Sequence, residues 1–262
     1  MLRILWNSKS TMIANQEKLD AISNNLANAN TDGYKRVTVS FQDLVSETLK
    51  RKGYPASDNN GNSKQQFTGT GVRTTGWIRD GKQGPLIETE KNTDFAIDGE
   101  GYFQVTRADG SIAYTRAGRF DTDSQNRIVD ANGSRVTVIY NEGINPDDIK
   151  YTKDNFKVSE TGEVLIKTPQ GFDVVGRLPV YSADGADAFR SIGESYYTPN
   201  QATNVYEVNN PDVLQGFVES SNVDMVTEMT DMMVTQRAFE LGSRGIKTAD
   251  EMWGMVNNLR SK

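Results

Sequence analysis

The chain has 262 residues, of which 36% are hydrophobic, and it carries a net charge of −6 at neutral pH. This length is sufficient for one large domain or two modest ones, and the acidic charge argues against nucleic acid or an anionic membrane as the main partner. The chain contains neither cysteine nor histidine, which excludes disulfides, thiolate metal sites and the common nucleophile–base pairs. We therefore expect a protein that is not an enzyme and that uses no cofactor or metal.

Apolar residues near the N-terminus predict a long amphipathic helix that ends at about residue 30. Large apolar side chains recur at intervals of seven, at Leu5, Met12, Leu19 and Leu26. This is the spacing of a coiled-coil seam, in which Ile22 and Ala29 occupy the second apolar position of the repeat. Thr31-Asp32-Gly33 then stops the helix, because glycine readily adopts the left-handed conformation after a helix C-terminus.

The same segment bears on export and on membrane association. No stretch of the chain reaches the roughly 20 consecutive apolar residues of a membrane-spanning helix. Residues 1–20 have no long apolar core and no small-residue cleavage site, so we do not expect a cleaved secretory signal. The sequence therefore predicts no direct membrane insertion, and either a cytosolic protein or one exported with its N-terminus intact.

The middle of the chain predicts short strands separated by Gly, Asn and Asp turn signals. The stretch at 95–114 has the alternation of a hairpin, with a turn at Ala108-Asp109-Gly110. Further hairpin turns are predicted at Thr161-Gly162 and Gln170-Gly171. Residues 50–71 are polar and contain no Leu, Ile or Val, so they predict a long exposed loop.

A second amphipathic helix is predicted from the SSNVDMVTEM stretch to about Leu259, with Ser221 or Asn222 as its N-cap. Large apolar residues stand seven apart at Met225, Met232, Phe239, Ile246 and Trp253, and Met229, Gly242, Ala249 and Val256 add neighbours on the same stripe. Gly242 and Gly245 are either mild helix defects or points of close helix approach. We expect the two terminal helices to pair as a coiled coil, with each other and with copies from other subunits.

Three motifs in the strand region bear on chemistry. Residues 121–132 have oxygen ligands at the first, third and fifth positions of a calcium loop, but they lack its glycine and glutamate, which favours a β-turn. Asp94 and Asp98 bracket a strand, and a solvated edge is a simpler interpretation than an acid–base pair. The glycines of GEGY, at 99–102, fit a tight turn between strands. None of these motifs indicates a catalytic site.

The fold class predicted from these elements is a mainly β core domain, irregular and sandwich or barrel-like, with long N- and C-terminal α-helices. Four regions follow. They are an N-terminal helix at 1–34, an extended strand with the polar insert at 35–80, a β-rich core at 81–205, and a linker with the C-terminal helix at 206–262.

Distinctive motifs stand at both ends of the chain. The N-terminal helix finishes in ISNNLANANTDGYKR, at residues 22–36. The C-terminal stretch at 216–256 has Ser221-Asn222-Val223 and Gln236-Arg237-Ala238-Phe239 at its centre. In this order, the two motifs resemble the N- and C-terminal motifs of bacterial flagellar axial proteins, the family of rod, hook and hook-associated proteins.

The middle of the chain resembles the β-domain of the same family. The matching stretches are GTGV at 69–72, residues 83–105, and YTRAGRF at 114–120. The length of the chain and its polar insert resemble the distal rod branch of the family, with a proximal rod or hook-type paralogue as the alternative.

The resemblance implies a structural subunit of the basal-body rod, located in the flagellum within the bacterial cell envelope. Such a subunit self-assembles into a helical tube that transmits torque from motor to hook for motility. The implied partners are sister copies, other rod and hook proteins and the type III export apparatus; ring or bushing proteins around the rod are further candidates. Export through that apparatus accounts for the missing signal peptide.

Assembly offers a reason for the apolar stripes and for the asparagines that end the first helix. Each stripe lacks partners in a single chain, so we expect the chain ends to be largely disordered until neighbouring subunits cover them. The residues expected at the subunit interface are Leu5, Met12, Leu19, Ile22, Asn24, Asn25, Leu26, Asn28, Met225, Met229, Met232, Gln236, Phe239, Ile246 and Trp253.

We hypothesise that the amides fix the register between subunits, because a polar residue in a helical interface does so at some cost in stability. The alternative is that Asn24, Asn25, Asn28 and Asn30 simply fray and cap the helix end. On the register hypothesis, leucine at Asn25 and Asn28 leaves monomer folding unchanged and gives misregistered or failed rods.

Two other function classes are compatible with parts of the sequence. One is a monomeric secreted or surface-binding β module whose terminal helices form a local coiled coil. The other is a carboxylate enzyme, which needs a deep pocket with perturbed acids. For the polar insert at 50–71, we predict a position between subunits, as a spacer that stiffens the tube.

Overall fold

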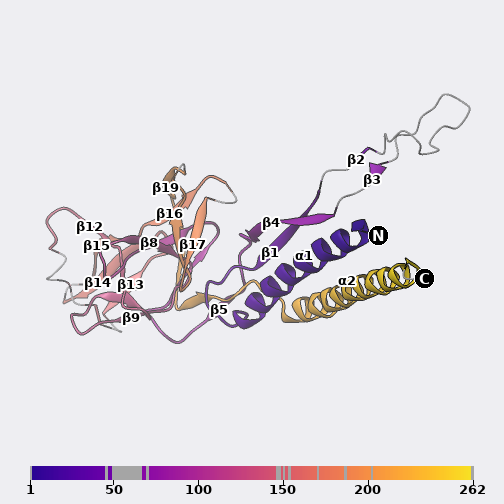
Figure 1. Cartoon of the computed structure of the whole chain (residues 1–262). Helices are drawn as coiled ribbons and strands as arrows, with labels where there is room; N and C mark the ends of the chain where they lie inside the picture. The colour runs from indigo at the N-terminus through magenta and orange to yellow at the C-terminus, as the bar shows by residue number, and fades with distance from the viewer. Residues whose placement is uncertain are drawn as a thin grey trace, which may run out of the picture. The chain divides into compact units, whose positions relative to one another are not determined.

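A computed structural model describes residues 2–44, 47–48, 67–68, 71–145, 149, 151–152, 155–169, 171–185, 188–201 and 203–260. The polar segment at 50–71 therefore lies almost entirely outside the described residues, and its role as a spacer stays a prediction. The described part of the chain has a long helix at each end and short antiparallel strands between them (Figure 1). This confirms the predicted class, a β-rich core flanked by two long helices.

The chain forms two compact units, and each is built from segments that are distant in sequence. The first, called the helical unit below, contains Met1–Leu26, Val37–Ile78 and Asp224–Lys262. The second, called the β unit, contains Ala27–Arg36 and Arg79–Val223. The short segment after the first helix therefore belongs to the β unit, although it adjoins the helix in sequence.

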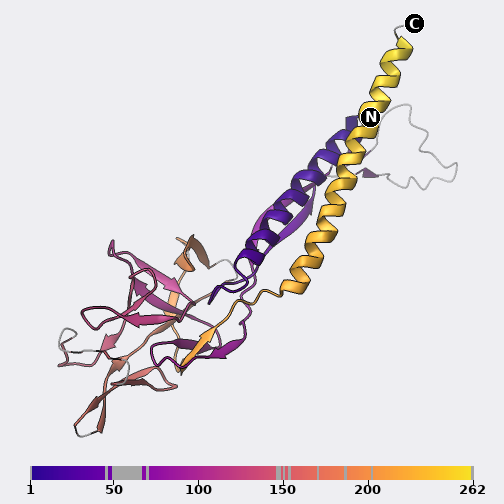
Figure 2. The same cartoon turned by 90° about the horizontal axis from the view of Figure 1, so that it is seen from below.

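The helical unit is built around α1 (Leu2–Ala27) and α2 (Met225–Arg260), which lie side by side in both views (Figures 1 and 2). The C-terminal end of α2 extends past the N-terminal end of α1 (Figure 2), because α2 has 36 residues and α1 has 26. Strand β1 (Val37–Asp43) pairs with β4 (Val72–Arg79). Beyond them, β2 (Glu47–Thr48) pairs with β3 (Phe67–Thr68).

The ends of both helices follow from local hydrogen bonds. After α1, Thr31 N donates to Asn28 O at 3.1 Å, and Gly33 has a φ of +68°, the left-handed stop that the sequence predicts. The N-cap of α2 is Asp224, not Ser221 or Asn222 as predicted. Its carboxylate accepts from Val226 N at 3.0 Å and from Thr227 Oγ1 at 2.6 Å, because an N-cap side chain must reach the first free amides of the helix.

The β unit contains one large antiparallel sheet. Its strands run in the order β17 (Phe189–Gly193), β18 (Tyr196–Pro199), β8 (Ile112–Thr115), β7 (Tyr102–Thr106), β11 (Arg135–Val136), β10 (Ile128–Asp130) and β9 (Phe120–Thr122), and β16 (Val180–Ala183) joins β7 to β19 (Val205–Glu207). The predicted hairpin with its turn at Ala108-Asp109-Gly110 is β7–β8, where Gln104 pairs with Tyr114. Gly110 supplies the positive φ of that turn, +82°.

A second sheet holds the other predicted hairpins. It runs in the order β12 (Ile139–Tyr140), β15 (Gly171–Arg177), β14 (Glu163–Thr168) and β13 (Phe156–Val158). Smaller pairs join β20 (Asp212–Gln215) to β6 (Phe95–Asp98) and β21 (Phe217–Glu219) to β5 (Leu86–Glu88). The turn predicted at 161–162 lies between β13 and β14, as expected from its glycine. Of the turn predicted at 170–171, Gln170 lies outside the described residues, and Gly171 begins β15.

Two of the three motifs weighed as chemical sites are turns. Asp123 lies between β9 and β10, where its carboxylate accepts from the amides of Gln125 and Arg127, both at 2.8 Å. The β-turn interpretation of 121–132 is therefore confirmed. The GEGY glycines turn the chain between β6 and β7, and Gly99 and Gly101 have positive φ values of +119° and +140°. Glycine accepts this conformation without the strain that other residues incur.

In the third motif, Asp98 is exposed, but Asp94 is 1% exposed. The Asp94 carboxylate accepts from Thr89 Oγ1 at 2.8 Å, so the solvated-edge interpretation is wrong for Asp94.

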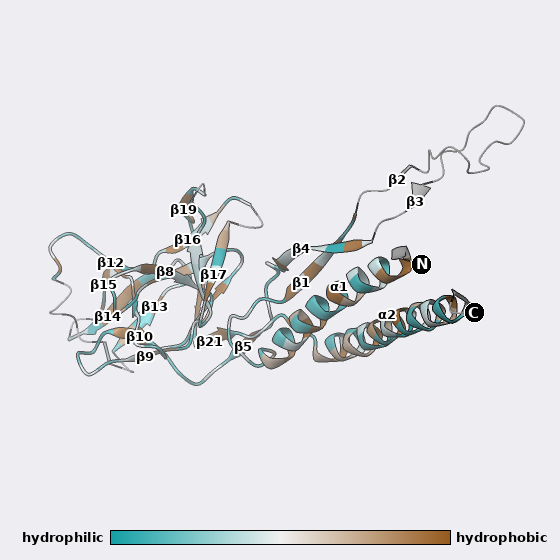
Figure 3. Ribbon diagram, in the orientation of Figure 1, coloured by the Kyte–Doolittle hydropathy of each residue, from teal (hydrophilic) through white to brown (hydrophobic). Residues whose placement is uncertain are grey.

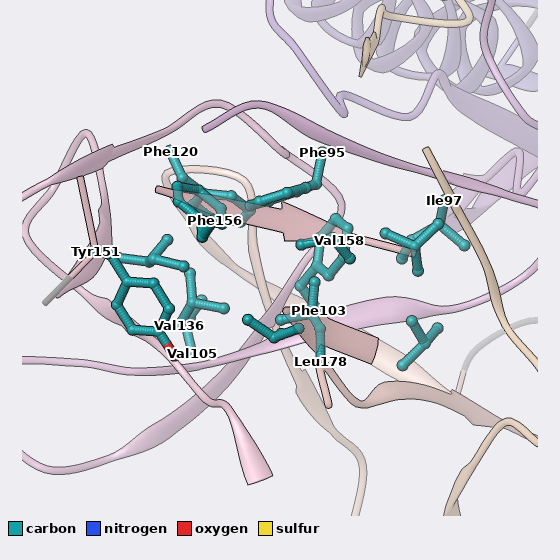
Figure 4. Packing of buried hydrophobic residues seen from close by; sticks show 14 of the residues in the cluster. Phe95, Ile97, Phe103, Val105, Phe120, Val136, Tyr151, Phe156, Val158 and Leu178 are labelled. Carbon is teal, nitrogen blue, oxygen red and sulfur yellow. The ribbon is translucent and has the colours of Figure 1, made fainter. Parts of the chain in front are cut away.

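The hydrophobic core lies in the β unit, between strands of several sheets (Figure 4). Phe103 and Val105 alternate with half-buried polar neighbours along β7, and both are fully buried. The Phe103 and Phe120 rings meet edge to face with their centroids 5.6 Å apart, which is a favoured aromatic geometry. Buried apolar area of this kind stabilises a fold by about 25 cal/mol per Å².

Candidate functional site

The two long helices approach each other closely at small residues. An added Cβ on Gly242 would lie 2.9 Å from Met12 Cγ, and one on Gly245 would lie 2.8 Å from Ser8 Oγ. Residue numbers on α2 rise as those on α1 fall, so the pair is antiparallel. Of the two interpretations of these glycines, close helix approach is therefore the one that holds.

The buried stripe of α2 agrees only in part with the predicted one. The residues that form it are spaced by seven: Glu228, Thr235 and Ala249 are buried, with the half-buried Gly242 between them. On the predicted stripe, Met225 and Trp253 are exposed instead. The predicted stripe included Gly242 and Ala249 but missed Glu228 and Thr235, because the prediction was centred on large apolar side chains and two helices in close contact need small ones.

The residues expected at a subunit interface fall into three groups. Ile22 and Asn25 are buried inside the chain. The half-buried ones are Leu5, Met12, Leu19, Leu26, Asn28, Met232, Phe239 and Ile246. The exposed ones are Asn24, Met225, Met229, Gln236 and Trp253. The exposed and half-buried groups are available to a neighbouring subunit, and their role in assembly stays a proposal.

Asn25 connects three elements of the helical unit. Its side chain is 1% exposed. Its amide nitrogen donates to Val37 O at 2.8 Å and to Glu228 Oε2 at 3.1 Å, and its amide oxygen accepts from Val37 N at 2.8 Å. The side chain thus bonds α1 to β1 and to α2. The pairing satisfies polar groups that would otherwise be costly to bury.

Within one chain, the Asn25 side chain is therefore enclosed by α1, β1 and α2 and not exposed to a neighbour. A role of Asn25 in the register between subunits stays a prediction. Asn28 fits the alternative interpretation, because it takes part in the turn that ends α1: its Oδ1 accepts from Thr31 Oγ1 at 3.2 Å.

Sequence reasoning missed much of the exposed apolar surface of α2. The most exposed large side chains there are Val226, Met233, Val234, Leu241 and Met255, at 74%, 55%, 58%, 65% and 60%. Ile4, Trp6 and Ile13 are exposed on α1. Hydrophobic residues are interleaved with hydrophilic ones along both helices (Figure 3). The consecutive Met232-Met233-Val234 was a signal that α2 is apolar on more than one side.

A buried charge network, called the Glu219 network below, holds the β unit together where several segments meet. Glu219 Oε1 accepts from Lys35 Nζ at 2.6 Å and from Gly84 N at 2.9 Å, and Glu219 Oε2 accepts from Arg116 Nε. Burial lowers the pKa of Lys35, and the hydrogen bond and charge of Glu219 oppose that shift. The carboxylate therefore keeps both cations compensated in the interior.

The remaining donors of the network bind backbone carbonyls. Arg116 donates to the carbonyls of Ile97, Gly99 and Gly101, which form the tight turn between β6 and β7. Lys35 Nζ also donates to Lys82 O at 2.7 Å. These bonds fix the course of the segment that follows α1 in sequence.

Asn222 plays a similar part near the segment that precedes α2 in sequence. Its Oδ1 accepts from Arg36 N at 2.6 Å, and its Nδ2 donates to Asp80 O at 3.1 Å and to Lys82 O at 2.9 Å. The predicted N-cap residue is therefore a bridge within the β unit.

The close approach at Gly242 leads to a first prediction. Gly242→Gln is expected to destabilise the helical unit by about 1–3 kcal/mol, because its side chain meets Met12 and forces the helices apart. Gly254→Gln is the matched control: no atom lies within 4 Å of its Cβ position, so the better helix former should stabilise α2 by up to about 1 kcal/mol. Urea unfolding followed by far-ultraviolet circular dichroism measures both, and equal effects would contradict the proposed contact.

Some features are absent from the described part of the chain. Neither described helix is both long and apolar enough to cross a membrane. Within the same residues, no cluster of three or more acidic side chains is arranged to hold a metal ion. The features that stand out are instead the exposed apolar helix surfaces and the internal networks.

Comparison with known families finds three matching models along the chain. The model for the flagella basal body rod protein matches residues 5–35, and the D1 domain model of the flagellar hook protein FlgE/F/G matches residues 96–166. The model for the C-terminal part of the flagellar basal body rod FlgEFG protein matches residues 214–259. The matches cover most of α1, part of the β unit, and nearly all of α2.

Relatives match over almost the full length. The flagellar basal-body rod protein FlgG of Borreliella burgdorferi is 32% identical over 270 residues, covering 99% of each chain. FlgG of Bacillus subtilis is 34% identical over 275 residues, covering 99% of this chain and all of that one. The flagellar basal-body rod protein FlgF of Caulobacter vibrioides is 33% identical over 236 residues, covering 90% of this chain and 89% of the other.

Proposed function

Because this chain belongs to the flagellar basal-body rod protein family, we propose that it is a subunit of the distal rod that assembles with copies of itself into a helical tube. The family is one of structural proteins, not of enzymes, and its members are located in the flagellar basal body. Membership in the rod and hook family implies assembly with flagellar axial proteins.

The observation that carries the proposal is the apolar surface of α2. Val226 and Leu241 are 74% and 65% exposed in the single chain, although the helix buries small and polar residues against α1. Burying such side chains against a neighbour gains about 25 cal/mol per Å² of apolar area. Exposed apolar surface on this scale favours contact with another protein, and sister copies in a tube supply that contact continuously.

Torque transmission follows from the same arrangement. Helices packed against neighbours along a tube resist sliding, because their interdigitated side chains must be separated before subunits can move. We propose that other rod proteins, the hook and the type III export apparatus are partners, with ring or bushing proteins around the rod.

Charged residues on the exposed apolar surface test this function. In cells whose only copy carries Met233→Asp and Leu241→Asp, we expect no complete rods and no swimming, because unpaired charges would be buried at the subunit interface. Stability of the purified monomer should change by no more than about 0.5 kcal/mol, since both positions are exposed. Glu240→Gln, at an exposed neighbouring position, is the control and should swim normally.

Electron microscopy of basal bodies and swimming in soft agar give the readouts. Normal rods in the double variant would contradict the proposed interface. Hydrogen exchange on the dilute chain separates the rod subunit from a monomeric binding module. Helices that are already protected as monomers, in a chain that never forms rods, would favour the module.

A further inference from the structure

A pocket of about 400 Å³ opens in the β unit, within the size range of ligand sites in proteins. Its lining includes three aromatic rings and three cations: Tyr102, Phe189, Tyr197, Lys35, Arg79 and Arg116. The Tyr102 ring lies 4.6 Å from the Phe189 ring and 5.1 Å from the Tyr197 ring, measured between centroids. The rings therefore form one continuous apolar wall.

Of the three cations, Arg79 is the one not bound to a carboxylate. Lys35 and Arg116 belong to the Glu219 network. Within the described residues, the Arg79 guanidinium lies 5.4 Å from the centroid of the Tyr197 ring, hydrogen-bonds the Tyr197 side chain and lies 3.5 Å from the Lys35 carbonyl oxygen. The distance to Lys35 O is long for a hydrogen bond, and a guanidinium has five N–H donors, so donors remain for a ligand.

The surroundings of Arg79 favour a carboxylate ligand. Burial raises the pKa of Tyr197 to about 12, so this phenol stays neutral and leaves the charge of Arg79 in place. Glu100 also lines the pocket, but its side chain is exposed. A planar guanidinium beside aromatic rings is suited to bind a carboxylate that has an apolar neighbour.

The β14–β15 hairpin carries such a group at its tip. Phe172 is 52% exposed and lies opposite Lys167 near the end of the hairpin. The carboxylate of the exposed Asp173 accepts from Thr168 Oγ1 at 3.0 Å. Neighbouring residues on a strand point to opposite faces, so the tip offers an aromatic ring on one face and an acid on the other.

We propose that, in the rod, the β14–β15 tip of one copy enters this pocket in a neighbouring copy, with Asp173 bound to Arg79. The inference rests on the proposed function, because it names the second copy as the occupant. The tip and the pocket are different surfaces of one chain: the hairpin belongs to the second sheet, and all three rings come from the large one. A head-to-tail contact relates each copy to the next by the same rotation. It gives a closed ring if that rotation closes, and an open helical assembly if it does not.

Cross-linking tests the contact directly, because the chain contains no cysteine. Lys167→Cys places a thiol opposite Phe172, and Glu100→Cys places one in the pocket lining. In oxidised rods from the double variant we expect a ladder of covalent multimers, and rods from either single variant should give none. Glu163→Cys with Glu100→Cys is the mismatched control, because Glu163 lies at the other end of β14 and is exposed.

Charge reversal gives an independent result. Asp173→Arg and Arg79→Glu should each reduce rods per cell about tenfold or more, since like charges then face each other across the contact. The combined variant should recover most of the loss, because the pair is restored with opposite polarity. If Arg79→Glu proves unstable on its own, Asp173→Arg and the cross-link decide the question.

The outcomes separate this inference from the proposed function. Rods that form normally in both charge variants and give no ladder would overturn the contact and leave the rod function intact. Normal rods in the Met233→Asp and Leu241→Asp variant would instead overturn the function on which the inference rests.

Discussion

Glu219→Gln is expected to lower the free energy of unfolding of the β unit by about 3–5 kcal/mol, because it leaves Lys35 and Arg116 buried without their anion. The glutamine has nearly the volume of glutamate, so the change removes the charge without opening a cavity. A loss of this size is a large part of the roughly 5–15 kcal/mol that holds a typical domain folded. We therefore expect little assembled protein and no swimming.

The aromatic residues allow this loss to be assigned to one unit. All three tryptophans of the chain, Trp6, Trp77 and Trp253, lie in the helical unit. The tyrosines of the core, such as Tyr196, lie in the β unit. Near-ultraviolet tyrosine signals during urea unfolding should therefore shift strongly in Glu219→Gln, while tryptophan fluorescence reports the helices.

Glu163→Gln is the matched control for this prediction. Glu163 is an exposed acid on β14, and its replacement should change stability by no more than about 0.5 kcal/mol. If the two variants unfold at the same urea concentration, the network contributes little, and the buried ions of the β unit are compensated by backbone carbonyls alone.

The parts of the fold that sequence could predict are those set by local periodicity. The seven-residue repeat located α1 and α2, and glycine turn signals located the β7–β8 and β14–β15 hairpins, because these patterns act over a few residues. The face of α2 that packs on α1 could not be chosen this way. The helix is apolar on more than one side, and the predicted stripe, which included Gly242 and Ala249, missed the buried Glu228 and Thr235 because polar side chains give no apolar signal.

The internal networks were beyond sequence reasoning for a different reason. Lys35 and Glu219 are 184 residues apart, and Arg116 and Glu219 are 103 apart. In a sequence, single charged residues look like ordinary surface positions, since charged residues are mostly exposed. Only the fold brings them together. Asn25 shows the same limit on a smaller scale. The concentration of asparagines at the end of α1 suggested contacts with other subunits, whereas the hydrogen bonds of Asn25 are made within the chain.

Asn25→Leu is expected to destabilise the helical unit by about 2–4 kcal/mol, the cost of leaving more than one buried polar group without its hydrogen bond. The amide now pairs with both backbone groups of Val37 and with Glu228, and leucine can replace none of these bonds. Tryptophan fluorescence should report the loss at a lower urea concentration than in the parent, and the tyrosine signals of the β unit should move less.

Asn24→Leu separates this internal role from a role between subunits. Asn24 is exposed one residue earlier on α1, so the same substitution there should leave monomer stability within about 0.5 kcal/mol of the parent. If the amides also fix register between copies, Asn24→Leu should still disturb rods, whereas Asn25→Leu fails at the level of the monomer. A stable Asn25→Leu monomer that forms defective rods would instead show that Asn25 acts between subunits, and that the bonds to Val37 and Glu228 add little to the fold.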